Sequence, residues 1–397
     1  MLAPISQRPL TEPTVIADWN IQIVHGTEAV LRLQGELTDL STRCGQPGAL
    51  DHLEYFLRRP KFARKIPCLV LFYSGAHGKA SSTDSKIVGA VLLYQYQLAG
   101  IGCRIFAADY HAGDRTLVGP QPFRAQMGCC ACHALLERGA LVVQLTCPVD
   151  LPVPELHCVS NAKDSSRWRW AASVRMMNGH IPLADTYEET LSGLGKHTRR
   201  NLRASRRHAA HDLGYTFVVN PVMSKEEFVA FNRASTHPES DEMTVWRYEA
   251  MKLLPDYLFL GIKAANGEWL SLIGGRRNHE RTIVEWQMNR TGLTDYSLST
   301  LMRSHLLEHE VGRGCKRLYF VGGTSHTMKY SQSTEYFLDL VTLRYSLSAF
   351  FLRRFARPLM LEHAFLVQAV GDPKLIWNRW ETGPAGWSPS VEPESFA

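Results

Sequence analysis

The feature that most constrains the fold of this chain is a strand–loop–helix–strand order in its last third. Arg281–Asn289, with aromatic and β-branched residues, predicts a strand, and the polar segment Gly292–Thr300 follows it. Thr300–Gly312 then predicts a helix that Gly314 ends, and Arg317–Val321 predicts a buried strand. Because the N–H groups of a first helical turn have no partner within the helix, this order is typical of a site that holds a pyrophosphate.

The same order occurs in the first half of the chain. Ile87–Tyr94 and Cys103–Asp109 predict a pair of strands, Phe123–Arg138 predicts a helix that Gly139 ends, and Ala140–Thr146 predicts a buried strand. The two halves are offset by about one domain length. We therefore expect a duplicated α/β unit.

The stretch between the two halves has the composition of a linker. Pro148–Arg167 concentrates proline, asparagine, aspartate and serine. Beyond it, Thr186–Glu189 is a capping-box pattern, and Thr198 is predicted to cap the next helix. The predicted divisions are an N-terminal domain at 1–160, a C-terminal domain at 161–350, and a helical extension with a disordered tail at 351–397.

Composition excludes several classes of protein. The formal net charge of +6 at pH 7 is mild for 397 residues, which suits an anionic ligand but does not require nucleic acid. The longest apolar run, Ile87–Tyr94, is far shorter than a membrane span, and Met1–Leu10 lacks the apolar core of a signal peptide. We expect a cytoplasmic protein with reduced cysteines and no membrane span.

One cysteine-rich segment has the spacing of a cofactor site. Cys129–His133 formally matches the C-x-x-C-H pattern of covalent haem attachment. The segment falls inside the amphipathic run Phe123–Arg138, where small thiols pack well, and no second Cys/His pair has a matching spacing. We interpret it as part of a helix core and predict no metal site.

A predicted helix in the second half carries five arginines on one face. Guanidinium groups bind phosphate oxygens in pairs, so CoA, a nucleotide-linked sugar or tRNA would suit this face. A solvated basic surface is the alternative interpretation. The arginines are Arg199, Arg200, Arg203, Arg206 and Arg207, of which we predict the first three to bind substrate.

Acid–base and oxyanion-stabilising side chains gather around the second strand–loop–helix–strand order. Transfer of an acyl group to an amine needs a base, and Glu285 or His326 could accept the proton. Lys329 could stabilise the oxyanion, and Tyr296 or Tyr330 could protonate a departing thiolate. Each side chain alone is equally compatible with ordinary packing or an ordinary surface position.

Three motifs in order resemble the CelD-like or Fem-like acetyltransferase branch of the GNAT superfamily. Lys196–Arg203 resembles its basic helix, Tyr296–Leu301 its loop and helix start, and Phe320–Gly323 with Met328 and Lys329 its closing strand and lysine. The resemblance covers roughly residues 180–335. It implies an α/β (α+β) fold of two tandem GNAT-like units, each a twisted mixed sheet flanked by helices. It also implies transfer from acetyl-CoA or another acyl-CoA to an amine or hydroxyl.

The resemblance also implies roles for individual residues. Met288, Asn289 and Arg290 would lie at the strand end that runs beside the pantetheine, and Lys329 near the reacting centre. Leu298 stands where proline is usual in the family, and Met328 where tyrosine is usual. The residues implied at the loop and helix start that hold the cofactor are Tyr296, Ser297, Leu298, Ser299 and Thr300.

Two other functions remain open from the sequence. A Fem-type transferase that takes its aminoacyl group from tRNA is favoured by the arginine face. A non-catalytic module that keeps the fold is favoured by Leu298 and Met328. In either transferase the acceptor would be a small molecule, with a nucleotide-linked or cell-envelope precursor as one candidate.

Overall fold

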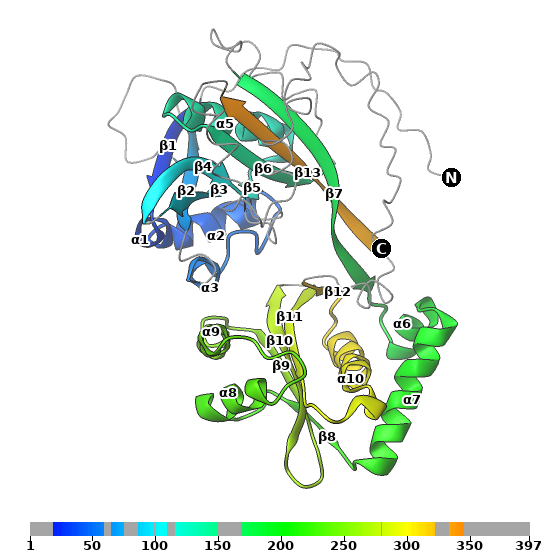
Figure 1. The fold of residues 1–397 in the computed structure, drawn as a ribbon. Coiled ribbons are helices and arrows are strands. Elements are labelled where there is room, and N and C mark those ends of the chain that lie inside the picture. The colour runs from blue at the N-terminus through cyan, green and yellow to red at the C-terminus, as the bar shows by residue number, and fades with distance from the viewer. Residues whose placement is uncertain are drawn as a thin grey trace.

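Two α/β units follow each other along the chain, one above the other in Figure 1. The computed structural model describes residues 19–58, 65–74, 86–98, 100–108, 116–148, 168–278, 280–321 and 333–344. The predicted extension and tail at 351–397 lie outside these residues.

The N-terminal unit packs helices on both faces of its sheet. One core lies under α5 and contains Phe72, Leu93 and Val143, and the other lies under α1–α3 and contains Leu37 and Leu50. Its elements are β1 (Trp19–His25), α1 (Thr27–Leu31), α2 (Gln34–Arg43), α3 (Leu53–Leu57), β2 (Lys65–Ser74), β3 (Ile87–Leu98), β4 (Ile101–Ala107), β5 (Leu117–Val118), a 3-10 turn (Gln121–Phe123), α5 (Arg124–Glu137) and β6 (Val142–Pro148).

The cysteines of α5 belong to this core. Cys129 and Cys132 are completely buried, and burial raises the pKa of the Cys132 thiol to about 12. The C-x-x-C-H match is therefore helix packing, as interpreted from the sequence. No group of side chains suited to a metal ion occurs in the described part of the chain, and the cysteines described there are free thiols.

The C-terminal unit repeats the arrangement. Helix α10 packs on one face of the sheet together with α6 and α7, and α8 and α9 cover the other face (Figure 1). Strand β7 (Trp168–Pro182) is the last strand of the N-terminal unit in sequence. The elements of the C-terminal unit are α6 (Tyr187–Gly193), α7 (Lys196–Asp212), β8 (Thr216–Val219), α8 (Lys225–Arg233), α9 (Asp241–Met251), β9 (Tyr257–Lys263), β10 (Trp269–Asn278), β11 (Arg281–Asn289), a 3-10 turn (Thr294–Tyr296), α10 (Leu298–Gly312), β12 (Arg317–Phe320) and β13 (Ser333–Arg344).

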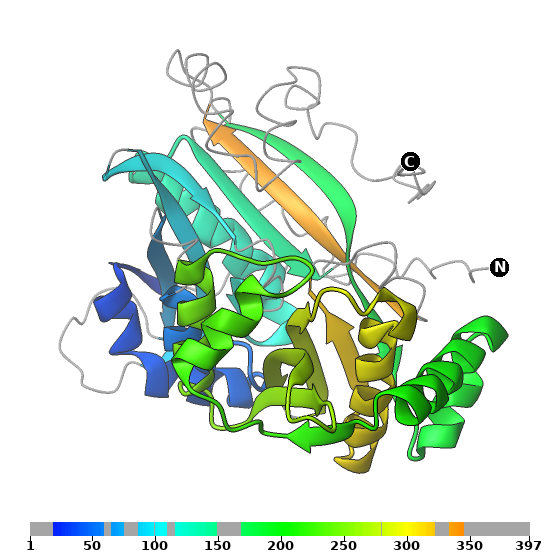
Figure 2. The same ribbon diagram turned by 60° about the horizontal axis from the view of Figure 1, so that its bottom comes forward.

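The two units exchange their last strands. The strand order is β1-β2-β3-β4-β6-β13-β7-β12-β11-β10-β9-β8, with β5 attached to β3. Strand β7 follows the N-terminal unit in sequence but pairs with β12, whereas β13 follows the C-terminal unit but pairs with β6. The two exchanged strands pair antiparallel along their length and run together between the units in Figures 1 and 2. The two mixed sheets are thus joined edge to edge.

This architecture confirms the predicted fold class of two tandem α/β units. In each unit a parallel pair brackets one helix, namely β4 and β6 around α5 and β11 and β12 around α10. The capping box at Thr186 is confirmed. The prediction that Thr198 caps the next helix is wrong, because α7 begins at Lys196 and its N-cap is Gly195. The domain boundary at 160/161 lies outside the described residues and stays a prediction.

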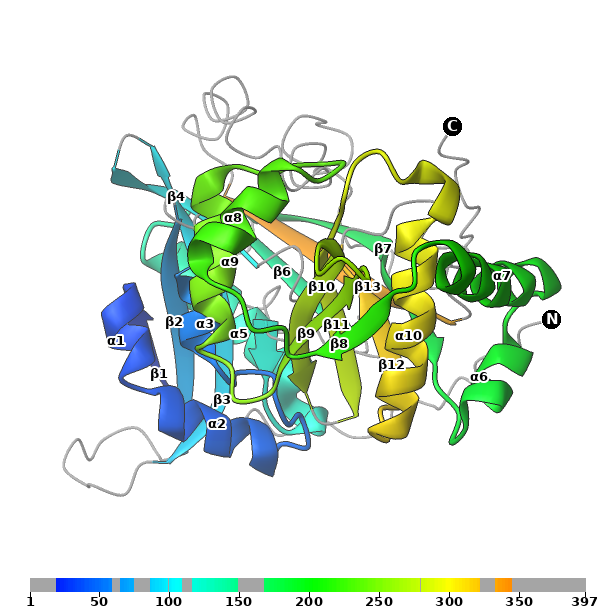
Figure 3. The ribbon, with the colours of Figure 1, turned by 90° about the horizontal axis from the view of Figure 1, so that it is seen from below.

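Helices α3 and α9 hold the two units together on one side of the sheet, where they lie next to each other in Figure 3. Tyr55 and Phe56 of α3 pack against Ala250 and Leu254. The guanidinium of Arg276 lies 4.9 Å from the centre of the Phe56 ring. These contacts make the interface a packed core with charged groups at its margin.

A bulge shapes β11 where it faces this interface. Gly274 pairs with Trp286 and Gly275 pairs with Val284, so Glu285 is the extra residue. A Cβ atom on Gly275 would lie 2.0 Å from the carbonyl oxygen of Ile283. Only glycine leaves room for the backbone at this position.

A Gly275→Ala substitution is therefore expected to lower the free energy of unfolding by about 1–3 kcal/mol through overpacking. Gly35→Ala is the matched control, because a Cβ atom there would meet nothing within 4 Å and the residue lies in α2. Alanine in a helix is expected to stabilise by about 0.5–1 kcal/mol relative to glycine. Urea unfolding measures the stability change of each variant, which should be negative for Gly275→Ala and positive for Gly35→Ala. Equal unfolding midpoints of the two variants would contradict the close contact between Gly275 and the backbone of Ile283.

Candidate functional site

The candidate site begins where β11 and β12 separate. The parallel pairing runs from Arg281 with Arg317 to Val284 with Phe320, and the N–H of Val321 then donates to the carbonyl of Val284 (2.8 Å). Beyond the bulge, β11 continues to Asn289 without β12 beside it. The edge of β11 that follows the bulge is therefore free of this neighbour.

Backbone groups of β11 point to this open side. The carbonyl of Asn289 accepts a hydrogen bond from the N–H of Thr236 (2.9 Å), whereas the N–H of Arg290 donates to Leu270 on the β10 side (2.9 Å). Because successive residues of a strand point their backbone groups to alternate sides, Gln287 faces the same open side as Asn289. Among the described residues, its backbone N–H and C=O have no recorded partner on that side. An extended ligand could pair with them.

At the N-terminus of α10, two of the N–H groups that were expected to hold the cofactor are already bonded within the protein. The N–H of Ser297 donates to Thr294 (3.2 Å) and that of Thr300 donates to Ser297 (2.8 Å). The N–H groups of Leu298 and Ser299 have no recorded acceptor within the described part of the chain. Ser297 adopts a left-handed conformation (φ 46°) that begins the helix without a side-chain cap. Leu298 is buried and Ser299 is half-buried, and the cleft beside them is lined by Ser297 and Thr300.

An open cleft of about 650 Å³ lies between this helix start and α7. Figure 3 shows α7 lying beside α10 at the outer edge of the molecule. The rings of His208 and Tyr296 are 5.2 Å apart and lean against each other at the wall of the cleft. Its lining residues are His197, Thr198, Asn201, Ala204, Ser205, His208, Asp295, Tyr296, Ser297 and Thr300.

The lining of this cleft is polar and nearly uncharged. It contains hydroxyls, an amide and two imidazoles, with Asp295 as its one acidic side chain and neither lysine nor arginine. An anion there would rely on N–H groups and the positive end of the α10 dipole rather than on cationic side chains.

The arginines of α7 divide into two groups. Arg203 pairs with Glu188 (2.5 Å), and Arg206 pairs with Glu308 (2.7 Å) and donates to the carbonyl of Ser304 (2.8 Å). Arg199 donates to the carbonyl of Ser192 (2.8 Å). These three side chains fasten α7 to α6 and α10. Arg200 and Arg207 have no recorded partner among the described residues.

Glu285 lies in a buried polar cluster between the units. Arg276 donates to its carboxylate (3.0 Å), and the hydroxyl of Tyr55 from α3 donates to the other oxygen. The side chains of Arg276 and Glu285 are 7% and 9% exposed. Arg276 and Tyr55 occupy both oxygens of the carboxylate, so Glu285 ties the two units together.

The remaining predicted residues are placed as follows. Met288 packs in the core with Phe228 and Trp286, and its backbone groups face β10 rather than the open side. Asn289 accepts from Ser271 (2.8 Å), and Arg290 pairs with Glu268 (3.1 Å). Leu298, the first residue of α10, is buried, and Tyr296 lines the cleft. His326, Lys329 and Tyr330 lie outside the described residues.

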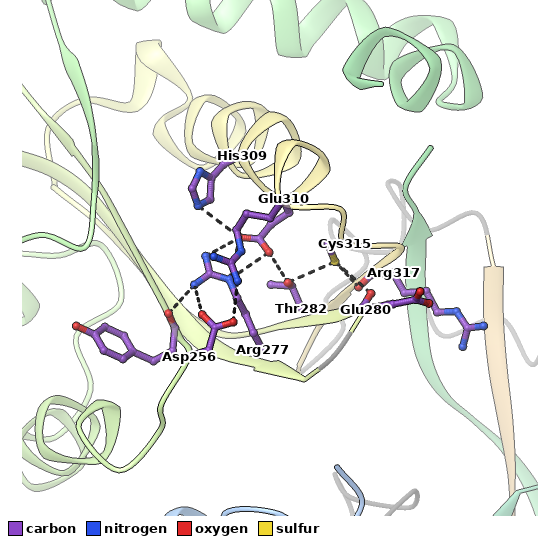
Figure 4. A network of polar contacts seen from close by, with 10 residues as sticks. Asp256, Arg277, Glu280, Thr282, His309, Glu310, Cys315 and Arg317 are labelled. Atoms are coloured by element: carbon purple, nitrogen blue, oxygen red, sulfur yellow. Dashed lines mark hydrogen bonds and ion pairs between the residues drawn. The ribbon is translucent and has the colours of Figure 1, made fainter. Parts of the chain in front are cut away.

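The opposite end of α10 is fixed to the sheet by a buried ion pair, shown in Figure 4. Arg277 of β10 donates to Glu310 from both Nη2 (2.6 Å) and Nε (3.1 Å), and Thr282 of β11 donates to the same carboxylate. Arg277 also donates to the carbonyl of Tyr257 (2.6 Å). Asp256 bridges the group to Arg313 at the surface. The helix start at the cleft is thus held in place from its far end.

Sequence reasoning missed part of this site. His197, Asn201 and His208 recur at helical spacing on the face of α7 that lines the cleft. This spacing is visible in the sequence, next to the arginines of the same helix. The open backbone of Gln287 leaves no signal in the sequence, because it depends on where β12 ends.

No family model and no curated protein sequence matches this chain. Solved structures that are similar include L-PGS from Bacillus licheniformis, at 13% identity over 85% of this chain and 97% of that one, with a TM-score of 0.47. FemX matches at 10% identity over 76% and 93%, with a TM-score of 0.49. A tandem GNAT protein from the clavulanic acid biosynthesis pathway matches at 11% identity over 81% and 98%, with a TM-score of 0.41.

None of these three similarities reaches a TM-score of 0.5, so the strand order above, and not the similarity, defines the fold. A search of the described helices finds none with the length and apolar character needed to cross a bilayer. Among the described residues, the candidate site is the β11 edge beyond the end of β12, together with the α10 N-terminus and the polar cleft beside it.

Proposed function

We propose that this chain is an acyltransferase that moves an acetyl or other acyl group from acyl-CoA to an amine or hydroxyl of a small acceptor. The observation that supports it most is the cleft of about 650 Å³ beside the α10 N-terminus, which Ser297 and Thr300 line. Among the described residues, the neighbouring N–H groups of Leu298 and Ser299 have no recorded acceptor. The sequence resemblance to GNAT-type acetyltransferases points to the same chemistry. The acceptor class, including an envelope precursor, is part of the proposal.

In this proposal the donor extends along β11. Its diphosphate accepts hydrogen bonds from Leu298 and Ser299, and its pantetheine pairs with the backbone of Gln287. The thioester then lies near the bulge, close to the start of the segment that carries His326 and Lys329. Leu298 keeps its N–H, which proline would lack, so its departure from the family pattern adds a donor rather than removing one.

The catalytic roles in this proposal are those expected from the sequence, on residues that lie outside the described part of the chain. The acceptor nitrogen attacks the thioester carbonyl, the C–N bond forms, and the C–S bond breaks. His326 accepts the proton from nitrogen, and Tyr330 protonates the thiolate. Lys329 stabilises the oxyanion of the tetrahedral intermediate. Glu285 stays bonded to Arg276 and positions the bulge.

Titration of the protein with acetyl-CoA and CoA by calorimetry tests the donor site. We expect saturable binding of one donor per chain, and a rise in melting temperature with ligand concentration. Variants His326→Ala and Lys329→Ala should keep this binding while losing thiol release in the presence of amines. Transfer unchanged in both variants would remove their catalytic roles. No donor binding at all would overturn the proposal.

A second candidate is an aminoacyl-tRNA-dependent transferase, supported by Arg200 and Arg207 of α7, which are exposed and have no recorded partner among the described residues. In that case tRNA would bind and the affinity would fall steeply with added salt. Arg200→Gln and Arg207→Gln should each weaken tRNA binding and leave binding of acetyl-CoA unchanged. Donor binding without tRNA binding would reject this candidate.

A further inference from the structure

A second, smaller pocket lies in the N-terminal unit, away from α10. It has a volume of about 340 Å³ and opens at the ends of β1–β4 beside the last turn of α5. Ile66, Phe106 and Leu135 form apolar walls, and His25, Gln95 and Arg138 supply polar groups. The pocket contains no acidic side chain.

Arg138 brings an uncompensated positive charge to this pocket. It is the C-cap residue of α5 and is exposed. The neighbouring Glu137 pairs instead with His133 (3.5 Å). Among the described residues, no carboxylate lies within ion-pair distance of Arg138. A ligand carboxylate would therefore meet a guanidinium that is free to bind it with two parallel hydrogen bonds.

The other polar groups of the pocket are neutral and fixed. Burial and the charge of Arg138 hold the pKa of His25 below its usual value, so its imidazole is uncharged near neutral pH. Its Nε2 atom lies 3.9 Å from the Cys68 thiol. Gln95 donates to the carbonyl of Cys103 (2.8 Å), and the absence of a side chain at Gly102 leaves space for its amide.

Size and charge together select a class of ligand. A cavity of about 150 Å³ holds one benzene ring, so this pocket has room for a ring or a short alkyl chain together with a carboxylate. One guanidinium matches one negative charge, and a ligand with several phosphates would leave most of its charge unpaired. We propose that this pocket is a second ligand site, which binds a small apolar monocarboxylate through Arg138.

Benzoate, hexanoate and the uncharged analogue benzyl alcohol are the probes for this site. The His25 ring resonances, assigned with a His25→Gln variant, should shift and saturate with either carboxylate. Benzyl alcohol should bind at least about tenfold more weakly, because it cannot form the charge-assisted pair. Equal binding of the alcohol, or no saturable shift of His25, would overturn the proposal.

A matched pair of variants identifies the arginine. Arg138→Gln should weaken benzoate binding at least about tenfold. Arg32→Gln should leave it unchanged, because Arg32 is likewise an exposed C-cap residue of the same unit, at the end of α1. Both substitutions are at exposed positions, and equal melting temperatures would show that folding is intact. Equal losses in the two variants would reject the role of Arg138.

Discussion

An Arg277→Ala variant is expected to lose about 3–5 kcal/mol of unfolding free energy, because it leaves the Glu310 carboxylate buried without its charge partner. The side chain of Glu310 is 0% exposed and that of Arg277 is 6% exposed. Thr282 cannot neutralise the carboxylate, since it supplies one hydrogen bond and no charge. Chemical unfolding followed by tryptophan fluorescence measures the loss.

Arg313→Ala is the control for this loss. Arg313 pairs with Asp256 (2.7 Å) in the same group of residues, but its side chain is 42% exposed. Exposed pairs contribute about 0–1 kcal/mol, so this variant should unfold nearly like the parent protein. If Arg277→Ala and Arg313→Ala lost similar amounts of unfolding free energy, burial would not explain the contribution of the Arg277–Glu310 pair.

A Ser297→Asp variant is expected to bind acetyl-CoA about a thousandfold more weakly, because like charges about 4 Å apart near a protein surface repel by about 4 kcal/mol. Ser297 lines the cleft and stands at the N-cap of α10. A carboxylate at the helix N-terminus also interacts favourably with the α10 dipole, which stabilises the helix by about 0.3–1 kcal/mol. The melting temperature should therefore stay equal or rise. Calorimetric titration measures the loss of acetyl-CoA affinity, and thermal unfolding of the same preparation measures the change in melting temperature.

Ser297→Asn separates charge from shape in this experiment. Asparagine, like aspartate, tolerates the left-handed conformation of this residue and caps helices, but it carries no charge. Its binding of acetyl-CoA should stay close to that of the parent. If both variants bind equally well, no anion lies at the α10 N-terminus and the proposed donor site is wrong.

Much of the fold could be predicted because its elements follow local patterns. The bounds of β11 agree with the predicted Arg281–Asn289, and those of α10 differ by two residues from the predicted Thr300–Gly312. The start of α7 was misjudged because Gly195 caps it through the backbone alone. The exchange of β7 and β13 could not be predicted, since pairing between strands so far apart in sequence leaves no periodic signal.

The candidate site divides in the same way. The loop and helix start at Tyr296–Thr300 were found from their order, and an open cleft lies there. The partners of Glu285 and Arg203 could not be predicted from the sequence. Tyr55 lies 230 residues from Glu285, and Glu188 lies 15 residues from Arg203 on another helix. Whether a charged side chain is free or neutralised depends on such distant contacts.

The reciprocal placement of β7 and β13 makes the two halves depend on each other for folding. The sheet of each half is completed by a strand from the other half: β7 pairs with β12, and β13 pairs with β6. A gene fragment for either half alone would leave a long ladder edge unsatisfied and prone to aggregation. Neither half is therefore expected to stay soluble and folded when it is produced without the other.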